Sequence, residues 1–392
     1  MTHLSVAFES AKTPAEVKAT SAGICQLIKD KKLKIADLSI RDIAVSTLGM
    51  EAVMKMGESS EGGFSQDSVG FESVAPVNTQ AFLDITGNLI YEAGIEGYRS
   101  PDFIGDRLVT AESASIDGGR DIGLSAIDDE AMVVKEGEEF PDTNFGQDYI
   151  DIPLSEKRGL KIGLTKEAIF FDRTGKIVEN AMTIGYRLGL SKEKRTLRTV
   201  LGITNNYSRR GVARNTYVAT GGGDPRINLK AATPLTDWTG LDAMVQLFAD
   251  MSDDRLVPEP VKVEPKQLLL PGQLTVTAQR IMNATEVRTV TNTAITTIGG
   301  NPISKMEIIT SPWIVWLLVE AGVDPTVAKN RWYAGDFKRA FKYRTLFPYE
   351  MRSAVPNGPA DFERDVLAQF RCSERGTPRI VAPWHVAEFN AA

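Results

Sequence analysis

The spacing of apolar residues predicts several helices in the first half of the chain. Residues 8 to 57 place apolar side chains at helical intervals, which predicts one or two helices. Residues 79 to 98 predict a short amphipathic helix, and residues 174 to 201 predict a long one. Gly185 and Gly189 lie within this long helix, and we expect them to allow another segment to approach it closely.

The second half alternates short strands with helices. A helical pattern covers residues 241 to 248, and a helix is predicted from Pro271 to Met282 because proline favours a first helical position. Near the C-terminus, turns rich in glycine and proline separate predicted strands at 331–333, 342–351, 362–373 and 379–389. The pattern as a whole indicates an α+β fold.

Charge is distributed unevenly along the chain. Residues 112 to 142 hold ten acidic and two basic side chains, too polar a set to build a core alone. Residues 149–154 and 158–165 then alternate apolar and polar positions as exposed strands do, so we expect an extended acidic hairpin. Residues 173 to 198 hold seven basic and two acidic side chains. The predicted hairpin and long helix therefore carry opposite charge.

Composition narrows the class of protein. The 392 residues are 42% hydrophobic and 24% charged, which is typical of a globular chain with two or three compact domains. A net charge of −6 argues against a dedicated nucleic-acid binder, which needs a basic surface. The sequence has neither a signal-like start nor an apolar run long enough to span a membrane, so we expect a cytoplasmic product. Cys25 and Cys372 lack metal-ligand spacing and are expected to be packing residues.

Candidate catalytic residues are few. The histidines are His3, near the chain end, and His385, in a strand-like run where a packing role is favoured. Residues 221–225 are rich in glycine but lack the lysine of a phosphate-binding loop. Acidic residues 128–130 and 136–139 offer oxygens to a divalent cation, although a solvated acidic face is favoured over a metal site. We predict no catalytic, cofactor or metal site.

Aromatic and basic residues intermingle between residues 313 and 349. They suit either a base-stacking surface or a packed core, and core packing is favoured, with Trp313, Trp332 and Phe341 as expected core residues. The basic tract suits either an acidic loop of a neighbouring copy or DNA; it comprises Lys329, Arg331, Lys338, Arg339, Lys342 and Arg344.

Three C-terminal segments support a family resemblance: residues 266–271 before a helix, residues 331–343, and residues 362–371. Together with the hairpin and helix before them, they resemble the major capsid protein family of tailed bacteriophages (Caudoviricetes), whose fold encapsulins share. The resemblance covers about residues 80 to 392. It implies six parts in chain order. The first half holds an N-terminal helical arm or scaffold-like segment with linker (1–75), an arm helix (76–111) and an extended loop (112–172). The second half holds a spine helix with peripheral domain (173–235), an axial domain (236–330) and closing peripheral strands (331–392).

The resemblance implies a structural role and no enzymatic activity. Pentamers and hexamers would form an icosahedral head shell enclosing double-stranded DNA without sequence-specific binding, assembled in the host cytoplasm and retained in the virion. Scaffolding, portal and decoration proteins are the implied partners. We expect inter-subunit contacts between the acidic loop and the spine helix through Glu136, Glu138, Glu139, Arg187, Lys194, Arg195 and Arg198.

Two other interpretations remain open from the sequence. An encapsulin-like nanocompartment shell would share the fold and enclose cargo enzyme instead of a genome. An enzyme with an acidic metal-binding loop at residues 128 to 139 is the less favoured alternative. Lys157 and Lys161 lie where some family members form covalent cross-links, but no matching asparagine is identified and no cross-link is predicted.

Overall fold

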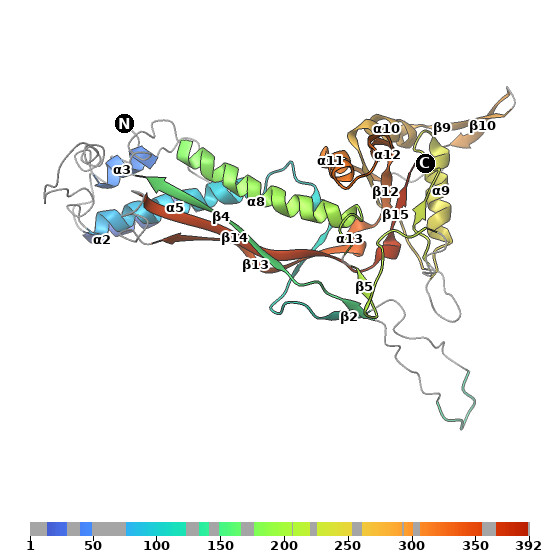
Figure 1. Cartoon of the computed structure of the whole chain (residues 1–392), viewed down its shortest axis with the longest axis horizontal. Helices are drawn as coiled ribbons and strands as arrows, with labels where there is room; N and C mark the ends of the chain where they lie inside the picture. Colours follow the sequence, from blue (N-terminus) through green and yellow to red (C-terminus); the bar gives the residue numbers. More distant parts are fainter. Residues whose placement is uncertain are drawn as a thin grey trace. The chain divides into compact units, whose positions relative to one another are not determined.

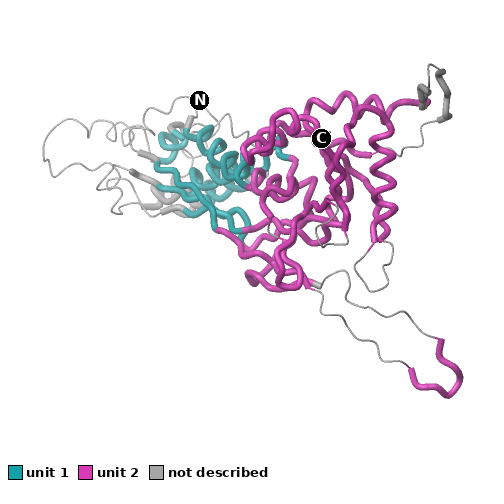
Figure 2. Tube along the Cα trace, turned by 45° about the vertical axis from the view of Figure 1, so that its right-hand side comes forward, with its two compact units in different colours: residues 1–103, 157–191, 347–375 teal, residues 104–156, 192–346, 376–392 magenta. Residues whose placement is uncertain are grey.

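A computed structural model describes most of the chain and divides it into two compact units (Figure 2). Unit 1 comprises residues 1–103, 157–191 and 347–375, and unit 2 comprises residues 104–156, 192–346 and 376–392. The residues that the structure describes are 14–29, 40–48, 76–122, 133–140, 149–165, 176–205, 207–219, 226–252, 261–291, 294–300, 306–354 and 366–390.

Three helices form the N-terminal part of unit 1 (Figure 1): α2 (Pro14–Lys29), α3 (Ile40–Leu48) and α5 (Pro76–Tyr98). Both α2 and α3 pack on α5. Ile24, Ile43 and Leu89 are buried, one from each helix, because the apolar stripes that predicted the helices face one another. The helices expected within residues 8 to 57 and 79 to 98 are confirmed, and residues 49–75, at the end of the segment expected to hold a linker, lie outside the described residues.

The long helix α8 (Lys176–Val200) confirms the predicted spine helix, and its first sixteen residues belong to unit 1. It crosses α5 where both helices carry glycines. A Cβ added to Gly185 would lie 2.8 Å from the carbonyl carbon of Gly94, and one added to Gly189 would lie 2.6 Å from the carbonyl oxygen of Tyr98. The helix backbones therefore touch directly, as the two glycines of the long helix predicted.

Two strands run from one unit into the other along the sequence. These are β13 (Phe341–Ala354) and β14 (Val366–Ile380), and they form a four-stranded sheet in the order β1-β13-β14-β4, with β1 (Thr110–Ser113) and β4 (Glu156–Thr165) at its edges. Strand β1 pairs in parallel with the start of β13 within unit 2. The long strand predicted at residues 342–351 is confirmed.

Unit 2 is built on a five-stranded sheet with the order β11-β8-β12-β15-β7. Its strands are β7 (Leu229–Lys230), β8 (Gln267–Leu270), β11 (Glu307–Thr310), β12 (Trp332–Gly335) and β15 (Val386–Phe389). The three central strands β8, β12 and β15 are buried along their whole length. Such strands need cover on both faces of the sheet.

Helices supply that cover on each face. Leu268 and Trp332 pack with α9 (Trp238–Ala249) and α10 (Thr275–Asn283). The next residues along the same strands, Leu269 and Tyr333, join the other cluster, which includes buried side chains of α11 (Trp313–Glu320), α12 (Pro325–Asn330) and the end of α8. Because successive strand residues point to opposite faces, one short apolar strand serves two cores. The α+β fold class is confirmed.

Shorter elements complete unit 2. A second four-stranded sheet joins β2 (Arg120–Ile122), β3 (Tyr149–Asp151), β5 (Ser208–Arg209) and β6 (Val212–Ala213), and β9 (Glu286–Thr291) pairs with β10 (Ala294–Gly300) as a hairpin. The remaining helices are α6 (Gly105–Leu108), α13 (Phe337–Ala340), and the 3-10 helices η2 (Gly272–Leu274) and η3 (Pro383–His385). None of the described helices is long and apolar enough to cross a membrane.

One strand prediction is wrong. We expected a continuous strand over residues 379–389, but β14 ends at Ile380 and η3 separates it from β15. The backbone N–H groups of Val381 and Ala382 both donate to the carbonyl of Ala340, which turns the chain there, and Pro383 then starts the 3-10 helix.

Candidate subunit interface

The base of the acidic loop is fixed to strands of unit 2. Strands β2 and β3 pair antiparallel, with Ile122 opposite Tyr149. The strands expected at residues 149–154 and 158–165 are present as β3 and β4, but they belong to different sheets. The hairpin as a whole stays a prediction, because much of it lies outside the described residues. The buried guanidinium of Arg379 binds Glu112 at 2.5 Å and Asp121 at 2.7 Å. Because a guanidinium presents donors in a rigid fork, this residue fixes two points of the loop at once.

A second arginine holds the loop through its backbone. Arg344 donates to the carbonyl oxygens of Ile116 and Gly118, each at 3.0 Å. The carboxylate of Asp117 accepts a 2.9 Å bond from the N–H of Ser155, which joins the outgoing and returning segments. These contacts anchor the segments on either side of the loop.

The tip of the loop, residues 133–140, forms a tight turn. The N–H of Glu138 donates to the carbonyl of Lys135 at 3.0 Å, and the Glu138 carboxylate accepts from the Lys135 N–H at 3.2 Å. Gly137 has φ +86°, which suits the third position of such a turn. Glu136, Glu138 and Glu139 are all exposed. The tip is thus a preformed acidic surface.

Apolar side chains flank this acidic turn. Val133 is 94% exposed and Phe140 is 80% exposed. The described tip therefore presents apolar as well as acidic side chains to solvent. The acidic group 128–130 and the segments 123–132 and 141–148 lie outside the described residues.

Three of the four basic residues singled out on the spine helix are engaged within unit 2. The ammonium of Lys194 lies 4.4 Å from the ring centre of Trp313 and 4.5 Å from that of Trp316. Arg195 donates to the carbonyl of Gly376 at 2.9 Å, and Arg198 forms a 2.8 Å ion pair with Glu320. The fourth residue, Arg187, lies in unit 1 and is exposed.

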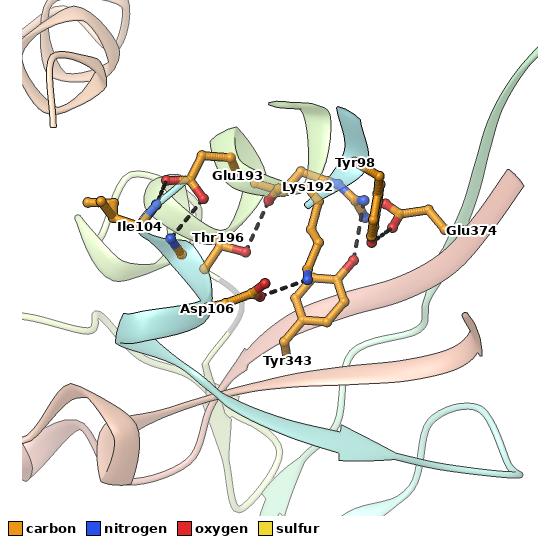
Figure 3. A network of polar contacts seen from close by, with 10 residues as sticks. Tyr98, Ile104, Asp106, Lys192, Glu193, Thr196, Tyr343 and Glu374 are labelled. Carbon is orange, nitrogen blue, oxygen red and sulfur yellow. Dashed lines mark hydrogen bonds and ion pairs between the residues drawn. The ribbon is translucent and has the colours of Figure 1, made fainter. Parts of the chain in front are cut away.

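A buried acidic residue on the same helix escaped the sequence interpretation (Figure 3). The Glu193 carboxylate accepts hydrogen bonds from the N–H groups of Ile104, at 3.0 Å, and Gly105, at 2.8 Å, and so caps α6 just before the loop. Burial raises the pKa of Glu193, and the two backbone donors oppose that rise. Its position four residues before the buried Leu197, on the apolar stripe, was the available signal.

The neighbouring Lys192 also contacts α6 (Figure 3). Its ammonium forms a 2.7 Å ion pair with Asp106 and lies 4.9 Å from the centre of the Tyr343 ring. The spine helix therefore binds α6 through an acid and an adjacent base. The orientation of α6 follows from that of the C-terminal part of α8.

The aromatic residues near the C-terminus are mostly core. Trp332 and Phe341 are buried, as predicted. The expectation that Trp313 is a core residue is wrong in degree, because its ring is half-buried and faces Lys194. Trp316, which carries the other ring beside Lys194, is 47% exposed.

The candidate catalytic groups sit in packed surroundings. His385 lies in η3, and burial, followed by the charge of Arg339, lowers its pKa. Cys25 and Cys372 are buried free thiols, and burial raises the pKa of Cys372. Within the described residues, no group of three or more histidine, cysteine or acidic side chains is placed to hold a metal ion. His3 and residues 221–225 lie outside the described part.

Comparison with known proteins places the chain in a family. A family model described as "Phage capsid protein" matches residues 153–374, which is more than half of the chain. A search of curated proteins finds no match. Several solved capsids share structural similarity at low sequence identity, although the assignment rests on the family model.

Three of these solved structures illustrate the similarity. The capsid of a native gene-transfer-agent (GTA) particle has 10% identity and a TM-score of 0.47, covering 75% of this chain and 91% of that one. The capsid of cyanophage P-SCSP1u has 10% identity and a TM-score of 0.45, covering 73% and 86%. The virus-like particle from Pyrococcus furiosus has 12% identity and a TM-score of 0.39, covering 76% and 97%.

The chain belongs to the phage capsid protein family. Within that family it is a major capsid protein, the structural subunit that forms an icosahedral shell and so a component of the virion. Since the family model describes phage capsids, the nanocompartment interpretation is not favoured.

Proposed function

We propose that the shell assembles through the acidic loop of each subunit, which reaches over a neighbouring copy in rings of five and six subunits. The observation that carries this proposal is the contrast within the loop. Its base is held by two arginines, whereas its tip presents three glutamates and two apolar side chains to solvent. A projecting hairpin gains stability when another surface covers it.

The finished shell encloses double-stranded DNA in this proposal. The net charge of −6 suits an enclosing wall that does not bind the packaged polymer tightly. Assembly takes place in the host cytoplasm, and the subunits act as structural elements without enzymatic activity. Many weak contacts repeated around closed rings then give a stable particle.

Expression of the chain alone and together with its neighbouring genes tests the proposal. Size-exclusion chromatography and negative-stain electron microscopy should show uniform icosahedral particles, and particles formed with the neighbouring genes should contain DNA. A persistent monomer or dimer under both conditions would refute the shell assembly.

The loop contact is tested by reversing charge at Glu136 and Glu139, while Glu138 is kept because it closes the turn. Particle yield should fall, and the loss should be greatest at low salt, where electrostatic attraction is least screened. The matched control reverses Glu96, on α5, and Asp250, which follows α9 as its C-cap; both are exposed, and the net charge changes by the same amount. Equal losses in both variants would contradict a role specific to the loop.

A further inference from the structure

Besides the basic residues of the spine helix, the structure shows another basic surface, which is formed by other segments of unit 2. Lys194, Arg195 and Arg198 each contact another group of unit 2 and are only partly exposed, so cations that are more exposed are better candidates to receive an acidic tip from a neighbouring copy. Within the described residues, exposed basic side chains gather around two adjoining hollows in unit 2. The hollows measure about 160 and 400 Å³ and share Lys266, Asp336 and Arg339.

This basic groove is defined by residues from separate segments. Four lysine or arginine side chains line it, together with a histidine and three acids; the full set used below is Lys262, Glu264, Lys266, Glu307, Asp336, Lys338, Arg339 and His385. The short helix α13 buries Phe337 and Ala340, so Lys338 and Arg339 point outward. Lys266 precedes the buried strand β8 and is itself 59% exposed on its side chain.

The carboxylates of the groove already have partners. Asp336 accepts from Lys266 at 2.8 Å and lies 3.7 Å from Arg339, and Glu264 pairs with Lys262 at 3.2 Å. Glu307 pairs with Arg107 at 2.6 Å. Counting Arg107, five cations face three carboxylates, so the groove carries a formal charge of +2.

The acidic tip has the complementary charge. Residues 135 to 139 hold one lysine and three glutamates, a formal charge of −2. The turn at Gly137 holds these side chains together before binding, so little conformational entropy is lost when the tip binds. A convex acidic turn and a concave basic surface of equal and opposite charge match in sign and in shape.

We propose that the basic groove is the docking site for the acidic loop tip of a second copy of this chain. The inference rests on the proposed function, in which the loop reaches a neighbour, and specifies the surface that receives it. The charge of −2 on the tip balances the +2 of the groove. A nucleic-acid backbone fits less well, because an extended polyanion brings further phosphates against the three carboxylates of the groove.

Charge exchange between the two surfaces tests the site. The tip variant is Glu136→Lys with Glu139→Lys, and the groove variant is Lys262→Glu with Lys338→Glu, which spares Lys266 and Arg339 beside Asp336. Each should lower particle yield at low salt by about tenfold or more, and the fourfold combination should restore most of it. The control Arg99→Glu with Arg280→Glu makes the same change in net charge at two exposed arginines outside the loop and the groove, and it should assemble normally.

A cross-linking measurement complements the yields. Particles formed from equal parts of isotopically labelled and unlabelled protein are treated with a carbodiimide, which joins a glutamate to a nearby lysine. Peptides linking residues 133–140 to Lys262 or Lys338 should combine labelled and unlabelled chains. Links confined to single-isotope pairs would mean that the tip binds its own chain and would overturn the proposal.

The outcomes separate the groove from the broader assembly mechanism. Loss of particles in the tip variant but not in the groove variant would leave the loop contact standing and refute this docking site. The docking site would also be refuted if the fourfold variant does not recover particle yield although its unassembled protein melts at the same temperature as the wild type. If the groove variant does not fold, Lys262→Gln with Lys338→Gln replaces it. If the groove variant forms normal particles that lack DNA, the groove is a nucleic-acid contact and the docking proposal is refuted.

Discussion

Replacing Gly185 by alanine should destabilise unit 1, although alanine is the better helix former. The new Cβ would lie 2.8 Å from the carbonyl carbon and 2.9 Å from the Cα of Gly94. The carbonyl oxygen of Gly94 would be nearer still. Because ordinary carbon contacts are about 3.5–4.0 Å, the two helices must separate by at least roughly 0.6 to 1.2 Å. The obstacle is the α5 backbone, which cannot rotate away as a side chain does.

Two opposing contributions set the expected magnitude. Alanine gains up to about 1 kcal/mol over glycine within a helix. Overpacking a close contact costs about 1–3 kcal/mol, and a backbone-to-backbone clash belongs at the upper end. The net loss should therefore be about 2 kcal/mol in the free energy of unfolding.

Urea unfolding of the unassembled protein measures this change, with Gly23→Ala as the matched control. Gly23 lies in α2, and an added Cβ there would meet nothing within 4 Å. The control should be neutral or stabilising by up to about 1 kcal/mol. If Gly185→Ala also leaves the urea midpoint unchanged or raises it, the direct helix contact is wrong.

Three further changes test other parts of the structure. Trp332→Ala should cost about 3–5 kcal/mol in urea unfolding, because the ring is fully buried, stacks on Phe389 at 4.2 Å and donates to Thr233; a loss below about 1 kcal/mol would contradict its placement. Glu193→Gln should cost about 1–3 kcal/mol by the same measurement, because the amide turns an N–H toward the donors of Ile104 and Gly105, and an unchanged midpoint would refute the cap. Burial raises the pKa of Glu388 from 4.5 to about 7, so the folded protein binds this proton more tightly than the unfolded one does; stability should fall by up to about 3 kcal/mol between pH 4.5 and 7, and Glu388→Gln should flatten that slope in unfolding curves taken across the range.

Much of the fold follows from local pattern. The spine helix could be predicted within two residues at each end, because its apolar stripe is long and its glycines mark the helix crossing. Strands β3 and β4 also followed from the alternation of apolar and polar positions at residues 149–154 and 158–165. The break at Pro383 was missed because a turn that is set by the distant carbonyl of Ala340 leaves only a weak local signal.

The sequence predicted the acidic tip of the candidate interface but not the buried Glu193. The acidic tip could be predicted from the sequence, because its charged residues are close together in the chain and charged side chains favour solvent exposure. Glu193 was hidden, because a single acid in a basic helix looks like a surface residue until the N–H groups of α6 are placed beside it. A buried carboxylate is recognised by its donors, and these lie about ninety residues away in the sequence.

The basic tract at residues 329–344 explains why local charge does not define a surface. In the structure Arg331 turns inward to pair with Glu388, and Arg344 holds the carbonyls at the loop base. Only Lys338 and Arg339 face the groove, because the single turn of α13 buries the residues on either side of them. The basic residues of this one tract therefore have three roles: an internal ion pair, an anchor for the loop base and a part of the groove. Lysines from another segment complete the groove. A charge pattern predicts an interface only after the fold has decided which of its members share a face.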